Sequence, residues 1–138
     1  MPLIYVDLIE GRTPAEVQAL LVTIHEAVLE AFTVPQRDRY QVVNSHPAHE
    51  IVALDTGLGI ARSSRLVIVH VVSRRRTCPQ KQRFYELLAS KLEEQCGLDP
   101  ADLVVSITTM RTGHSATGGH SSLPASCRAR SCGTAATP

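Results

Sequence analysis

The chain has no tryptophan, and only 4% of its 138 residues are aromatic. It also lacks a run of about 20 apolar residues, the length that a membrane-spanning helix needs, and its start lacks the pattern of a secretory signal. Basic and acidic residues nearly cancel, with 14 Lys and Arg against 13 Asp and Glu, so bulk attraction to nucleic acid is not expected. We therefore expect a cytoplasmic protein with neither a membrane nor a nucleic-acid partner.

Metal-ligand spacing is missing as well. The four cysteines form no Cys-x-x-Cys motif and the six histidines show no ligand spacing, so we expect reduced thiols and no metal site. Hydrophobic residues nevertheless make up 43% of the chain, enough to build the core of one domain.

Acidic residues are absent from the last 28 positions. Residues 111–138 contain one large aliphatic side chain, Leu123, and half of the eight glycines. Such a segment buries too little apolar surface to offset the entropy lost on ordering. We expect a single domain at residues 1–110, followed by an atypical, flexible tail at residues 111–138.

Regular hydrophobic patterns run through the first 110 residues. Strands are predicted at 3–8, 40–44, 66–72 and 103–107, and helices begin at Thr13-Pro14 and Cys78-Pro79. Thr13 and Glu16 have the spacing of a capping box, and Val34-Pro35 ends the first helix. The β-branched run 66–72 predicts a strand that is buried on both faces.

These elements repeat as strand, helix, strand. An offset of 65 residues maps Thr13-Pro14 onto Cys78-Pro79, which gives pseudo-repeats at about 2–44 and 66–107. Each crossover makes adjacent parallel strands. The predicted fold class is therefore α/β (α+β), a four-stranded, largely parallel-paired sheet with both helices on one face. The sheet face left bare predicts oligomerisation.

Pro2 is the first candidate for chemistry. Removal of Met1 would leave a secondary amine, which can act as a base, as an acid or as a nucleophile that forms an iminium. The alternative is an ordinary Met-Pro start with no catalytic role.

Charged residues supply the other candidates. Strand alternation predicts Arg74 and Arg76 on one side of the chain and Arg75 on the other, and two guanidinium groups can hold a carboxylate. Asp38, between Arg37 and Arg39, is a candidate acid. The alternatives are a solvated strand end for the arginines and a turn residue for Asp38.

Taken together, these features resemble the tautomerase superfamily, whose members use an N-terminal proline, and within it the malonate semialdehyde decarboxylase branch. The resemblance covers residues 1 to about 107. The segments that carry it include Met1-Pro2-Leu3-Ile4, residues 7–13, Ala31-Phe32, Asp38-Arg39-Tyr40-Gln41, Asp55-Thr56-Gly57-Leu58-Gly59 and Ser73-Arg74 with Arg76.

The resemblance implies roles for four residues: Pro2 and Asp38 as catalytic groups, and Arg74 and Arg76 as catalytic groups that bind the substrate carboxylate. It also implies a homotrimer, no cofactor, and decarboxylation of malonate semialdehyde (3-oxopropanoate) to acetaldehyde and CO2. Three alternatives stay open. They are a hydratase, a cis-3-haloacrylate dehalogenase, both acting on a small unsaturated carboxylic acid, and an inactive trimer that binds small carboxylates.

The chain departs from this family after Met110. One permitted coding string for residues 110–122, read from its third base, gives Glu-Asp-Trp-Ser-Phe-Gly-Asp-Gly-Arg-Ala-Gln-Phe. Family members carry Asp-Trp-Ser-Phe-Gly and Gly-Arg-Ala here, as a wall of the active site. The tail therefore looks frameshifted relative to the family.

Overall fold

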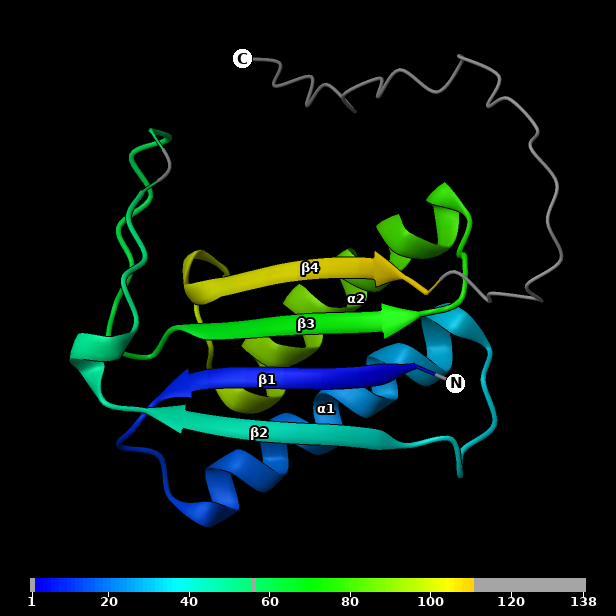
Figure 1. The fold of residues 1–138 in the computed structure, drawn as a ribbon, viewed down its shortest axis with the longest axis horizontal. Coiled ribbons are helices and arrows are strands. Elements are labelled where there is room, and N and C mark those ends of the chain that lie inside the picture. The colour runs from blue at the N-terminus through cyan, green and yellow to red at the C-terminus, as the bar shows by residue number, and fades with distance from the viewer. Residues whose placement is uncertain (1, 56, 111–138) are drawn as a thin grey trace, which may run out of the picture.

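The described part of the chain forms a four-stranded sheet with two helices on one face (Figure 1). The computed structural model describes residues 2–55 and 57–110, so the tail predicted to be flexible and frameshifted, at 111–138, lies outside the described residues. The elements are β1 (Leu3–Ile9), α1 (Pro14–Phe32), β2 (Tyr40–His46), the 3-10 turn η1 (Ala48–Glu50), β3 (Val67–Ser73), α2 (Cys78–Cys96), the 3-10 turn η2 (Pro100–Asp102) and β4 (Leu103–Thr109).

The strand order is β2-β1-β3-β4. The outer pairs, β1 with β2 and β3 with β4, are parallel, whereas β1 and β3 pair antiparallel in the centre of the sheet. The predicted α+β class, with two strand–helix–strand units and both helices on one face, is therefore confirmed.

Both helices start with the same capping motif. Thr13 caps α1 and Thr77 caps α2, and each forms a capping box with the residue three positions on, Glu16 or Gln80. Each helix has 19 residues, so the helices are related by an offset of 64 rather than 65. The sequence offset aligned the two prolines, but Pro14 is the first residue of α1 whereas Pro79 is the second residue of α2.

The core lies between the sheet and the helices. Every second residue of the two central strands faces the helix layer, and the buried set includes Ile4, Val6, Leu8, Val67, Val69, Val71, Ile24, Val28, Phe84, Leu88 and Leu92. The opposite face differs, because Ile68, His70 and Val72 are only partly buried. The prediction that β3 is buried on both faces is therefore wrong for the single chain, since both helices pack on the same side.

The uncovered face carries both apolar and polar side chains. Tyr40 and Val42 are exposed there at 50% and 43%. The Asp7 carboxylate accepts hydrogen bonds from Asn44 Nδ2 at 3.1 Å and His46 Nε2 at 2.8 Å. This hydrogen bond raises the pKa of His46 above its ordinary value, with a further contribution from Glu50.

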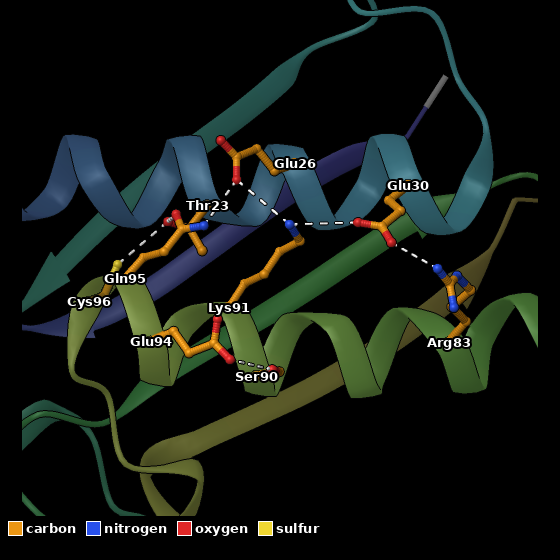
Figure 2. Close-up of polar contacts among 9 residues, drawn as sticks. All are labelled: Thr23, Glu26, Glu30, Arg83, Ser90, Lys91, Glu94, Gln95 and Cys96. Atoms are coloured by element: carbon orange, nitrogen blue, oxygen red, sulfur yellow. Dashed lines mark hydrogen bonds and ion pairs between the residues drawn. The ribbon is translucent and has the colours of Figure 1, made fainter.

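Polar contacts join the two helices on their outer side (Figure 2). Lys91 lies 3.9 Å from Glu26 and 3.6 Å from Glu30, which also pairs with Arg83 at 2.8 Å. Nearer the end of α2, Thr23 Oγ1 donates to Gln95 Oε1 at 2.9 Å. Within the described residues, no helix combines the length and the apolar character that crossing a bilayer requires.

Candidate active site

Because of the strand directions, one end of each of the four strands lies at the same edge of the sheet. β1 and β2 both begin at this edge, and β3 and β4 both end there (Figure 1). Pro2 immediately precedes β1, Asp38 lies two residues before β2, and Arg74 to Arg76 follow β3. The structure thus places all four predicted site residues at the same end of the molecule.

Pro2 is buried at this edge. Its neighbour Leu3 pairs with Tyr40 on β2 and with Val72 on β3. Pro2 therefore lies between the start of β2 and the end of β3. On the far side of β3, the backbone N–H of Met110 donates to the carbonyl of Ser73 at 2.7 Å. An amine at Pro2 would therefore lie among the strand ends at this edge of the sheet.

Asp38 is part of the turn that enters β2. Its backbone N–H donates to the Pro35 carbonyl at 2.9 Å, and its side chain is partly buried. The turn follows the end of α1, where Thr33 adopts a left-handed conformation with φ of 51°. This local geometry accounts for the turn role considered for Asp38 and also holds the residue near the start of β2.

The arginine triplet differs from its prediction. β3 ends at Ser73, so strand alternation does not extend to residues 74–76, and Arg74 and Arg75 are both exposed. Arg76 is partly buried. Its Nη1 donates to the Phe32 carbonyl at 3.3 Å, and its guanidinium carbon lies 4.7 Å from the centroid of the Phe32 ring. A cation this close to an aromatic face is held by a cation–π interaction.

The Nε donor of Arg76 is buried and unsatisfied within the part of the chain that the structure describes. A buried polar group without a partner costs roughly 1–3 kcal/mol. A carboxylate would satisfy such a donor, because guanidinium and carboxylate groups form charge-assisted hydrogen bonds.

Phe32 is a site residue whose role the sequence did not show. It is the last residue of α1 and stacks on Phe84 of α2, with ring centroids 5.0 Å apart. These are the only two phenylalanines in the chain. Phe32 is 2% exposed, and its ring packs against the Arg76 guanidinium. The one available signal was its place in the Ala31-Phe32 segment that the chain shares with the tautomerase superfamily.

The charges at this end are mostly positive, with three arginines after β3 and one carboxylate, Asp38, before β2. Such an end can attract and orient a small anion next to Pro2. In the described ranges, no group of three or more His, Cys, Asp or Glu side chains could hold a metal ion.

Comparison with known proteins identifies the class to which this arrangement belongs. Two models of tautomerase enzymes match the chain, one over residues 38–114, more than half of its length, and one over residues 2–61. The chain therefore belongs to the tautomerase family of enzymes.

Particular relatives fall within the same class. The chain is 50% identical over 107 residues to the probable tautomerase YrdN of Bacillus subtilis (strain 168), covering 78% of this chain and 83% of that protein. A second relative, the probable tautomerase YusQ of the same strain, is 28% identical over 106 residues, covering 76% and 84%.

Solved structures include two malonate semialdehyde decarboxylases. One is 43% identical with a TM-score of 0.78, covering 85% of this chain and 91% of that chain. The other, FG41 malonate semialdehyde decarboxylase, is 32% identical with a TM-score of 0.77, covering 86% and 91%. A fused 4-OT, at 22% identity and a TM-score of 0.66, covering 86% and 94%, shares the fold.

Proposed function

We propose that this tautomerase-family enzyme decarboxylates malonate semialdehyde to acetaldehyde and CO2 without a cofactor. The observation that carries the proposal is a buried Pro2 at the same sheet end as Arg76, whose Nε donor is buried and without a partner among the described residues. The two malonate semialdehyde decarboxylases, at 43% and 32% identity, support this activity, whereas the name of YrdN, at 50% identity, suggests tautomerisation as the alternative.

In this proposal the arginines bind the substrate. Arg76, fixed against Phe32, would hold the substrate carboxylate, and the exposed Arg74 would close over it. Their role is orientation, because the breaking C–C bond must overlap the carbonyl π system for electrons to flow into it. Binding the carboxylate too tightly in the ground state would slow the step, since the negative charge moves from the carboxylate to the enolate as neutral CO2 forms.

The chemical step then places a negative charge on the aldehyde end. The C–C bond breaks, CO2 departs, and the electron pair enters the carbonyl to form an enolate, whose carbon takes a proton to give acetaldehyde. A cationic Pro2 amine would stabilise the enolate oxygen. Alternatively, the neutral amine condenses with the aldehyde, losing water, and the iminium accepts the electron pair as an enamine. Protonation at carbon and hydrolysis then release acetaldehyde and the amine.

Asp38 would support the first of these routes. A carboxylate near an amine favours the cationic form of that amine. The same carboxylate could activate water for addition to an unsaturated acid. This second activity is favoured by one observation, namely that the 43% identical decarboxylase is described as having both decarboxylase and hydratase activities.

We also propose a homotrimer with the uncovered sheet face inside it. Tyr40 and Val42 expose apolar surface on that face, and exposed apolar patches of this kind commonly mark subunit interfaces. Fused 4-OT, which shares the fold, is described as a trimer.

One assay separates the candidate activities. The chain, shown by mass to have lost Met1, is incubated with malonate semialdehyde, and acetaldehyde is followed with alcohol dehydrogenase and NADH. Parallel reactions supply propynoate and cis-3-chloroacrylate, with malonate semialdehyde and chloride as readouts. The proposal predicts acetaldehyde as the fastest product. Faster hydration or faster halide release would contradict it, and so would the absence of acetaldehyde.

A further inference from the structure

A cavity lies at the opposite end of the sheet from Pro2. It has a volume of about 140 Å³ and is lined by Arg12, Glu16, Ala19, Leu20, Arg65, Gln95, Cys96 and Leu98. These residues come from the loop after β1, the start of α1, the segment before β3 and the end of α2, all on the left in Figure 1. A cavity of about 150 Å³ can hold benzene, so this space suits a ligand of about six non-hydrogen atoms.

The cavity has an apolar side and a polar side. Leu20 and Leu98 are each 3% exposed and supply an apolar floor. The Cys96 thiol lies 3.6 Å from Thr23 Oγ1, which also donates to Gln95, so α1 fixes this end of α2 (Figure 2). The polar wall is formed by Arg12, Glu16, Arg65 and Gln95.

The polar wall carries an excess of positive charge. Its one carboxylate, Glu16, already accepts from the Thr13 backbone N–H at 2.7 Å and the Thr13 hydroxyl at 3.1 Å, and lies 3.5 Å from Arg65 Nη2. Arg12 donates from one nitrogen, Nη2, to the Arg65 carbonyl, which occupies only part of its five-donor guanidinium. Burial and the nearby Arg65 cation lower the pKa of Arg12, which means that a second negative charge here would be favourable.

The internal repeat relates this cavity to the candidate active site. The helix offset of 64 maps Arg76 onto Arg12 and Phe32 onto Cys96. Arg76 contacts Phe32, and Arg12 and Cys96 line the cavity together. The residue before β3 is Leu66, buried at 2% exposure, where Pro2 precedes β1. This end therefore keeps the arginine of the active-site arrangement without the proline.

The buried carboxylate at this end, Asp102, already accepts hydrogen bonds from Ser63. Asp102, immediately before β4, is 5% exposed. It accepts a hydrogen bond from the Ser63 backbone N–H at 2.6 Å and another from the Ser63 hydroxyl. With Leu66 inside the chain there is no free amine, so a ligand at this end would be bound but not converted.

We propose that the Arg12–Arg65 cavity is a second, non-catalytic binding site for a small aliphatic carboxylate. The carboxylate would lie against the two guanidinium groups, and a short alkyl chain would lie against Leu20 and Leu98. Butanoate, with six non-hydrogen atoms, matches the volume. The proposal does not depend on which reaction occurs at the Pro2 end.

Methyl NMR of the leucine-labelled full chain tests the site by location. Butanoate is expected to move the Leu20 and Leu98 methyl signals in a saturable way. Butanamide, which has the same shape without the charge, should not move them, and inorganic phosphate should bind more weakly because it gains nothing from the apolar floor. Leu3, next to Pro2, reports binding at the active-site end separately.

Variants make the assignment specific. Arg65→Gln is expected to weaken butanoate binding at Leu20 and Leu98 by roughly tenfold or more, the effect of losing one hydrogen bond to a charged group. Arg12→Gln should do the same if the chain folds, as judged by circular dichroism. Arg83→Gln, which removes an exposed arginine on the helix layer, is the matched control and should leave the binding unchanged. The proposal is overturned if the Leu20 and Leu98 signals do not move, or if they move equally in Arg65→Gln.

Discussion

The two ends of the sheet carry corresponding elements, and they differ at the residue that precedes the strand, Pro2 at one end and Leu66 at the other. At one end Pro2 begins the first unit, with Arg76 packed on Phe32. At the other end Leu66 precedes the second unit, with Arg12 beside Cys96. Both ends hold an arginine at the start of a capped helix, so both can attract an anion. In our proposal, only the end with Pro2 can supply an amine once Met1 is removed, so the shared backbone plan would supply binding and the residue before the strand would supply reactivity.

Pro2→Ala should have the largest effect. Met1 is removed before alanine as well, so the variant keeps a terminal amine but changes its position and its nucleophilicity. We expect kcat/KM for malonate semialdehyde to fall by about 10²–10⁴, the usual range for loss of a general acid or base. Steady-state kinetics measure the loss, and an unchanged circular dichroism spectrum shows that the fold is intact. A loss below tenfold would mean that the two ends differ for another reason.

Arg76→Ala should come next. It removes the guanidinium held on Phe32, and we expect kcat/KM to fall by roughly 10²-fold, because a charge-assisted hydrogen bond to the substrate is lost. Arg75→Ala, which removes an exposed neighbour, is the matched control and should stay within about twofold. Equal losses in the two variants would indicate a general electrostatic effect.

The helix caps give a smaller effect that should be alike in the two units. Thr13→Ala and Thr77→Ala each remove a side-chain acceptor from a capping box. We expect each to lower the free energy of unfolding by about 1 kcal/mol. Urea denaturation measures both values. A difference above about 1 kcal/mol between the two variants would show that the units are not equivalent in stability.

His46 should produce the smallest effect, confined to the first unit. The hydrogen bond to Asp7 raises the pKa of His46 above 6.5, so protonated His46 stabilises the fold fully below that pH. The contribution disappears as pH rises through the raised pKa. His46→Gln should therefore lower the melting temperature more at pH 5.5 than at pH 8.5. His49→Gln, at an exposed position nearby, is the control. The same loss at both pH values would exclude the titration.

Local sequence signals predicted the elements well, because helix caps and alternating apolar residues depend on neighbours in the chain. The strand starting at Tyr40 continues two residues beyond its prediction, to His46, as does β4, to Thr109. A β-branched run cannot tell which face a neighbouring layer covers, so the burial of β3 was predicted wrongly. β3 ends at Ser73, so residues 74–76 lie outside the strand, and the side-chain alternation predicted for the arginines does not apply.

The candidate site was predictable residue by residue, but its geometry was not. Pro2, Asp38 and the arginines lie at the same end of the sheet because of the antiparallel pairing of β1 with β3, which no local pattern specifies. The contact between Arg76 and Phe32 joins positions 44 residues apart. The Arg12–Arg65 cavity depends on segments from both units in the same way, so no local sequence pattern indicated it.

The most direct test compares two forms of the same chain, one with Met1 removed and one in which an N-terminal extension is retained. Each is incubated with malonate semialdehyde, and acetaldehyde and CO2 are measured. The processed form should yield one of each per substrate consumed, whereas the extended form, which lacks the secondary amine, should yield neither above the uncatalysed rate. Equal rates from the two forms, or no acetaldehyde from the processed form, would contradict the assignment of the reaction to Pro2.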